Sequence, residues 1–168
     1  QNADGGWAST TGSSELDATA MVLTALAKYR TENEDAQAAV LKGLSYLASR
    51  QLPSGAIGTT AETTAQALVA LSTLGIDAAA DARFAQGGKT VLDGLLQYYL
   101  DGGGFYHVAS STSFNQMATE QAYYALAAYD RLTSGNARGL YDMNDAKQPD
   151  DAALDEILRE IDALGEIK

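Results

Sequence analysis

Small and apolar residues recur at helical spacing along most of the chain. The pattern is clearest in three alanine-rich stretches, residues 19–26, 64–71 and 119–126. Two further stretches, 35–49 and 89–100, carry valine and leucine three or four positions apart, which is typical of an amphipathic helix. No stretch alternates apolar and polar residues long enough to predict a strand. The pattern therefore predicts an all-α fold in which alanine-rich helices alternate with a second kind of helix.

The alanine-rich stretches belong to a repeat. Each follows a glycine-rich turn that ends in an apolar residue, here called the plug, and each begins with a threonine. The plugs are Trp7, Ile57 and Phe105, and the threonines are Thr19, Thr64 and Thr119. A period near 50 residues accommodates two helices and two loops, so each unit is predicted to be an αα-hairpin.

Polar residues just before the alanine-rich helices predict how those helices begin. Ser14-x-x-Asp17, Thr59-x-x-Glu62 and Ser113-x-x-Gln116 have the spacing of a capping box, in which two side chains satisfy free backbone N–H groups. Asp17 and Glu62 occupy the same position in their repeats. Their carboxylates are open to two interpretations, helix capping and contact with a ligand.

The composition changes after Gly139. Residues 140–168 contain nine acidic and three basic residues. The sequence is therefore divided into a helical-repeat domain, residues 1–139, and an acidic connector, residues 140–168. Within the connector, residues 150–164 predict a terminal helix with one apolar side made of Leu154, Ile157, Leu158, Ile161 and Leu164. Residues 142–146 resemble a calcium loop only weakly, because the glycine and the closing glutamate are missing, so no metal is expected.

Charge and residue usage exclude several functions. The chain has 168 residues, enough for one domain, and 22 acidic against 11 basic residues give a net charge of −11. This charge argues against binding to nucleic acid or to an anionic membrane surface. Cysteine is absent and histidine occurs once, which excludes disulfides, thiolate chemistry and two-histidine metal sites. No apolar run is long enough to span a bilayer, and no cofactor is expected.

The first turn and helix resemble a known repeat. Gln-Asn-Ala-Asp-Gly-Gly-Trp at residues 1–7, followed by a Thr-Ala-x-x-Leu helix, is similar to the prenyltransferase/squalene-oxidase repeat of terpenoid cyclases and protein prenyltransferases. The resemblance covers residues 1–135 and is weaker in the second and third units, where Ile57 and Phe105 replace tryptophan. It implies an α/α toroid in which the alanine-rich helices are inner and the others outer. Three hairpins make about half a ring, which implies an exposed inner face that dimerises, docks onto further repeats or binds a ligand.

A second resemblance concerns the connector. Residues 153–165 look like the opening of helical spacer repeats in large Gram-positive surface proteins. This similarity implies an extracellular location on a bacterial cell surface.

The residues that enzymes of the toroid family require are missing. Prenyltransferases bind zinc through Asp, Cys and His, and thioester proteins need a Cys. The squalene–hopene-type Asp-x-Asp-Asp motif does not occur, and the acids of residues 150–155 miss the magnesium-binding spacing of terpene synthases by one position. No catalytic residue is therefore assigned. The alternative is a cyclase- or transferase-like enzyme fragment whose catalytic acids lie outside this chain.

The favoured function is a non-catalytic binding or adhesion module for a small molecule, glycan or peptide. In a toroid the glycine turns and the starts of the inner helices share one rim, which would collect aromatic, amide and carboxylate side chains. The predicted ligand-binding residues, here called the rim residues, are Trp7, Glu15, Asp17, Glu62, Phe105, Tyr106, His107, Phe114, Asn115 and Gln116. Two alternatives stay open: Trp7, Ile57 and Phe105 as structural plugs, and a spacer that only projects another domain.

Overall fold

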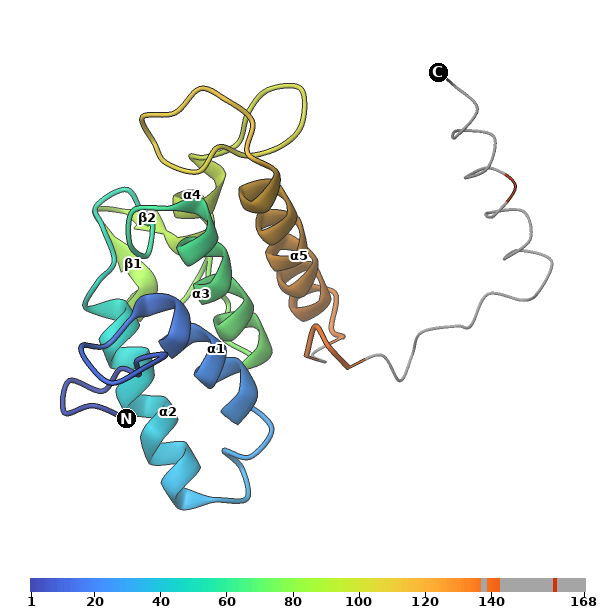
Figure 1. The fold of residues 1–168 in the computed structure, drawn as a ribbon. Coiled ribbons are helices and arrows are strands. Elements are labelled where there is room, and N and C mark those ends of the chain that lie inside the picture. The colour runs from blue at the N-terminus through green and yellow to red at the C-terminus, as the bar shows by residue number, and fades with distance from the viewer. Residues whose placement is uncertain (137–138, 143–158, 160–168) are drawn as a thin grey trace.

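The computed structural model describes residues 1–136, 139–142 and 159 (Figure 1). Its helices are α1 Leu16–Leu26, α2 Glu34–Ala48, α3 Ala61–Thr73, α4 Val91–Leu96 and α5 Gln116–Thr133. A 3-10 turn, Ala82–Phe84, leads into a small antiparallel hairpin of β1 Ala85–Gln86 and β2 Lys89–Thr90. The prediction of a mostly helical fold is confirmed.

The three alanine-rich helices form one layer. Helix α3 lies in the centre, with α1 packed along one side and α5 along the other (Figure 1). Helices α2 and α4 lie behind this layer, α2 against α1 and α4 against α3. Eleven residues of α3 are buried, among them Ala61, Ala65, Ala67 and Ala70. Alanine allows this because helices with small side chains at their contacts approach one another closely.

A threonine hydroxyl ties each glycine turn to the helix that follows. The three hydrogen bonds run from the Trp7 N–H to Thr19 Oγ1 (2.9 Å), from the Phe105 N–H to Thr119 Oγ1 (2.8 Å) and from the Thr64 hydroxyl to the Ile57 carbonyl (3.2 Å). Each hydroxyl also donates to the carbonyl four residues earlier. Plug and threonine are thus equivalent in all three units.

Glycines let the second helix of a unit approach the turn before it. A Cβ added at Gly43 of α2 would lie 2.7 Å from the Trp7 ring, and one at Gly94 of α4 would lie 2.2 Å from the Ala56 nitrogen. Real Cβ atoms do not approach other atoms so closely. The close backbone contact of α2 and α4 with the preceding turns therefore depends on glycine, which has no side chain at these positions.

The predicted capping boxes are wrong in register. The residues that precede α1, α3 and α5 are Glu15, Thr60 and Asn115, not Ser14, Thr59 and Ser113. The Thr60 and Asn115 side chains accept hydrogen bonds from backbone N–H groups, whereas Glu15 does not cap. Ser14 is engaged elsewhere, because its hydroxyl donates to Asp4 Oδ1 at 2.6 Å. Asp17 and Glu62 are therefore not capping-box partners.

The second unit differs from the sequence prediction in two places. The helix expected over residues 89–100 is only Val91–Leu96, and its first turn carries a complete capping box made by Thr90 and Asp93. The hairpin was not predicted at all. Its turn is Gly87-Gly88, with φ angles of 61° and 77°, which is the pair of left-handed residues that a tight two-residue hairpin requires.

Residues 139–142 return to the helical layer. Arg131 of α5 donates from Nη1 to the carbonyls of Gly139 (3.1 Å) and Leu140 (3.2 Å), and Leu140 packs against the core. The predicted terminal helix and most of the calcium-like loop lie outside the described residues. In the part of the chain that is described, no helix is long and apolar enough to cross a membrane.

Candidate functional site

A groove of about 910 Å³ runs between α1 and α3 beneath residues 139–142. Helix α1 contributes Met21, Thr24, Ala25 and Lys28, and α3 contributes Gln66, Val69 and Thr73. The remaining lining residues are Ala27, Tyr29, Gly139, Leu140, Tyr141 and Asp142. The groove is thus open on the face of the layer that α2 and α4 do not cover.

The inner wall of the groove carries a buried amide. Gln66 is 8% exposed, and its Nε2 donates to Gln121 Oε1 (3.2 Å) and to the Tyr124 hydroxyl. Both partners come from α5. The network therefore fixes a polar group in the middle of an otherwise alanine-rich helix.

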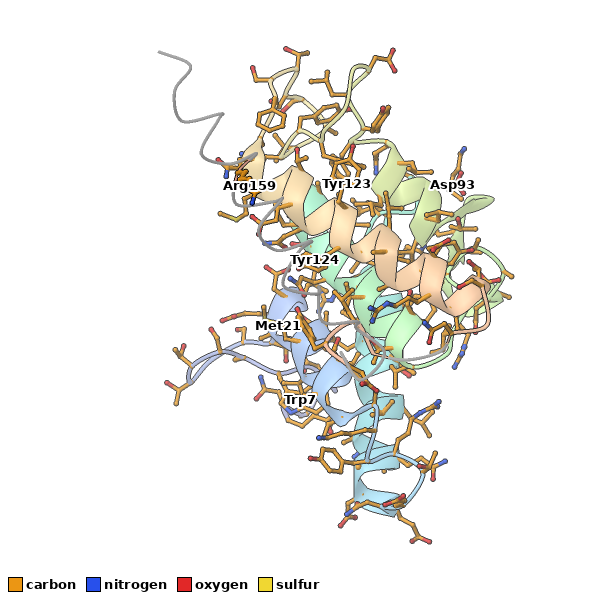
Figure 2. The ribbon with its side chains drawn as sticks, turned by 90° about the vertical axis from the view of Figure 1, so that its right-hand side faces the viewer. Trp7, Met21, Asp93, Tyr123, Tyr124 and Arg159 are labelled. Carbon is orange, nitrogen blue, oxygen red and sulfur yellow. The ribbon has the colours of Figure 1, made fainter. Side chains whose placement is uncertain are left out.

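The Tyr124 hydroxyl is held in its neutral form. Burial raises the pKa of Tyr124 to about 12, and the neighbouring Tyr141, Asp17 and Glu120 add to the rise when they carry negative charge. Figure 2 labels Tyr124 on α5 and Met21 on α1, both on the side turned toward the viewer. At neutral pH the tyrosine is therefore an uncharged group that both donates and accepts.

Aromatic and charged groups surround the open part of the groove. Tyr29 and Tyr141 are 51% and 72% exposed. The Lys28 ammonium lies 4.7 Å from the centre of the Tyr29 ring, a cation–π distance. Asp142 adds a carboxylate to the lining. The groove thus offers apolar, aromatic and hydrogen-bonding surfaces together.

Among the rim residues, Glu62 and His107 are brought together. His107 Nδ1 lies 2.9 Å from both carboxylate oxygens of Glu62. Glu62 is 9% exposed, whereas the imidazole is about half exposed. The His107 carbonyl also accepts from the Ala61 N–H at 3.0 Å. The pair therefore joins the loop before α5 to the first turn of α3.

Trp7 and Phe105 are plugs. Trp7 is half-buried under Gly43 of α2, and Phe105 is 1% exposed. The Phe105 ring packs edge to face against Tyr99 (5.5 Å) and Tyr123 (5.9 Å). These contacts agree with the structural interpretation of the plugs, and Ile57 is likewise fully buried.

The other rim residues have local roles or are exposed. The Tyr106 hydroxyl donates to the Gln97 carbonyl, the Glu15 carboxylate accepts from the Ser9 hydroxyl at 2.8 Å, and Asn115 caps α5. Asp17, Gln116 and Phe114 are exposed, and Phe114 lies over Gly104. The rim residues are distributed over the starts of three helices, and none of them lines the groove.

The groove was not among the sites predicted from the sequence. Residues from the middle of α1 and α3 form its floor, whereas the predicted rim residues lie at the starts of the helices. One signal was present: Gln66 is a large polar residue between buried alanines. A glutamine at such a position requires a polar partner, which here comes from α5.

The described residues contain no group of three or more His, Asp or Glu side chains placed to hold a metal ion. In the same residues the His107 imidazole is paired with Glu62, and no hydroxyl hydrogen-bonds to it. The hydrogen-bonded nucleophile and base of a hydrolytic triad are therefore not present there.

No family model, curated protein or solved structure matches this chain.

Proposed function

We propose that this domain is a non-catalytic ligand-binding module and that the groove between α1 and α3 is its site. The observation that carries the proposal is the groove itself. Its volume of about 910 Å³ lies within the range of pockets that hold small organic ligands. Its lining combines an apolar base with a few polar groups, which is the arrangement that gives both affinity and orientation.

The lining favours a ligand with apolar faces and many hydrogen-bonding groups. Tyr29 and Tyr141 present aromatic rings, and Thr24, Gln66 and Thr73 present hydroxyl and amide groups. Tyrosine combines a flat apolar surface with a polar tip, which suits sugar rings and peptide bonds. A glycan or a peptide is therefore the proposed ligand class.

The proposal also includes the complete fold to which this domain contributes and its cellular location. The single layer of α1, α3 and α5 with α2 and α4 behind it is the arrangement expected of part of an α/α toroid, with the groove on the inner face. The proposed location is the surface of a Gram-positive bacterium, as the similarity of the connector to spacer repeats implies. Dimerisation through the open inner face is the competing use of that surface.

A matched pair of substitutions tests the proposal. Ala25 is exposed and lines the groove, whereas Ala38 is exposed on α2 and does not. Ala25→Trp fills the groove without entering the core, and Ala38→Trp adds the same side chain elsewhere. Native mass spectrometry would be run on both variants and the parent with cell-wall glycan fragments, peptides, corrinoids and prenyl diphosphates.

We expect the parent chain and Ala38→Trp to retain an adduct of the glycan or peptide class. Ala25→Trp should lower the affinity at least about tenfold, equivalent to about 1.4 kcal/mol. Equal retention by both variants would place binding outside the groove. A dimer without any adduct would assign the inner face to assembly.

A further inference from the structure

Among the described residues, nothing covers the third glycine turn as α2 and α4 cover the first two. Gly5, Gly55 and Gly103 precede their plugs by two residues and share φ angles of 91°, 90° and 98°. A Cβ at Gly5 would lie 2.6 Å from the Lys42 carbonyl oxygen of α2, and one at Gly55 would lie 2.0 Å from the Thr90 carbonyl oxygen. At Gly103 the nearest atom among the described residues is the Tyr123 hydroxyl, 3.9 Å away. No outer helix of the described chain packs on this turn.

The inner helix of the third unit is uncovered on the same side. Leu23, Leu68 and Tyr123 each follow the shared threonine by four residues. Leu23 and Leu68 are fully buried, but Tyr123 is 51% exposed. Ala127, one turn further along α5, is also exposed. In Figure 1, α5 is the edge of the helical layer, and Figure 2 labels Tyr123 on α5.

The order of helices along the chain indicates which segment would cover the exposed face of α5. In the first two units the outer helix is the next α-helix after the inner one, and residues 27–33 and 74–90 connect them. In the third unit the corresponding interval, residues 134–149, leads to the apolar pattern of residues 150–164. The chain has also returned to the correct end of α5, because Arg131 holds the carbonyls of Gly139 and Leu140 there.

We propose that residues 150–164 form the outer helix of the third unit and dock on the exposed face of α5. The apolar side of that helix would cover Tyr123 and Ala127, as α2 covers Leu23. Arg159, which has helical backbone and is exposed, lies about 140° around a helix from Leu154 and therefore on the opposite, polar side. Residues 143–149 span at most about 25 Å when extended. They must carry the chain from the groove face, which residues 139–142 line, around the C-terminal end of α5.

Negative charges on both surfaces oppose this docking, which makes the docking dependent on ionic strength. The segment is acidic, and the α5 face carries Glu120 and Asp130. Apolar burial must therefore outweigh a repulsion between like charges. Because salt screens that repulsion, docking should tighten as the ionic strength rises.

Single cysteines introduced into the 168-residue chain test the proposal, because its sequence contains no other cysteine. Ala127→Cys places a thiol on the α5 face, and Ala38→Cys places one on the exposed side of α2. Each would be reacted with an uncharged thiol reagent, alone and combined with Leu158→Asp on the apolar side of the segment. Ala163→Asp adds the same charge on its opposite side and is the matched control.

Docking predicts that Ala127→Cys reacts at least about tenfold more slowly than Ala38→Cys, as expected for a protected site. Leu158→Asp should abolish the protection, Ala163→Asp should leave it, and dilution should not change it. Equal rates at the two cysteines would overturn the proposal. Protection that dilution removes would identify a second copy as the occupant, and protection that survives Leu158→Asp would exclude the segment.

Discussion

At the scale of single residues, three threonine hydroxyls organise the glycine turns. Each bridges a plug to the first turn of the next helix, and two of them accept from the plug's own N–H. Phe105 is buried, so its N–H cannot exchange this bond for water. The Thr119 hydroxyl therefore contributes more to the free energy of unfolding than the hydroxyl of a threonine that bonds only within its helix.

Thr119→Val tests this role. It keeps the shape of the side chain but leaves the Phe105 N–H without its acceptor, so the free energy of unfolding should fall by about 1–3 kcal/mol. Urea denaturation followed by circular dichroism measures the change. Thr133→Val, at an exposed threonine that bonds only within its own helix, is the control and should change stability much less.

Tyr124 gives a pH-dependent prediction at the same scale. Its pKa in the folded chain, about 12, exceeds the ordinary value of 10.0. The fold therefore favours the protonated tyrosine, and this contribution to stability is complete below pH 10 and is lost as the pH rises toward 12. In a spectrophotometric titration, Tyr124→Phe should remove a late-titrating tyrosine. Persistence of the same late step in that variant would show that another residue causes it.

At the scale of elements, close backbone contact sets the positions of α2 and α4. Gly94 is in the middle of α4, where alanine would ordinarily stabilise a helix. A Cβ there would meet the backbone of Gly55 and Ala56 at 2.2–2.5 Å, and backbone atoms cannot move aside as a flexible side chain can. The steric cost therefore exceeds the gain in helix propensity.

Gly94→Ala should accordingly lower the free energy of unfolding by about 1–3 kcal/mol or more. Thermal or urea denaturation measures this effect. Gly139→Ala is the control, because its nearest neighbour, the Thr73 methyl, lies at an ordinary 3.6 Å. A stabilised Gly94→Ala variant would show that α4 does not rest on the second turn.

The elements themselves were largely predictable from the sequence. The helical periods identified every long helix, and aligning the plugs with the threonines identified the equivalent turns. The capping register failed because several Ser and Thr residues adjoin each helix start, and local patterns do not show which hydroxyl is already engaged, as that of Ser14 is by Asp4. The short α4 and the Gly87-Gly88 hairpin depend on tertiary packing over Pro53 and the second turn.

At the scale of the whole molecule, the site was less predictable than the fold. The rim residues lie at or near the starts of α1, α3 and α5, but most of their side chains serve the turns, and Glu62 and His107 form a side-chain pair. The groove forms where α1 and α3 face residues 139–142. The repeated sequence pattern does not include these four residues, so it could not predict the contact. A site of this kind depends on how separate segments pack in three dimensions, which the pattern within each segment does not show.

The central claim is that the groove between α1 and α3 binds a glycan or a peptide. The most direct measurement is a two-dimensional amide NMR titration of the full chain with cell-wall glycan fragments and with peptides. Binding in the groove should shift the amide signals of Thr24, Gln66 and Thr73 most. Shifts confined to Phe105, Tyr106 and Phe114, or no shifts with either ligand class, would contradict it.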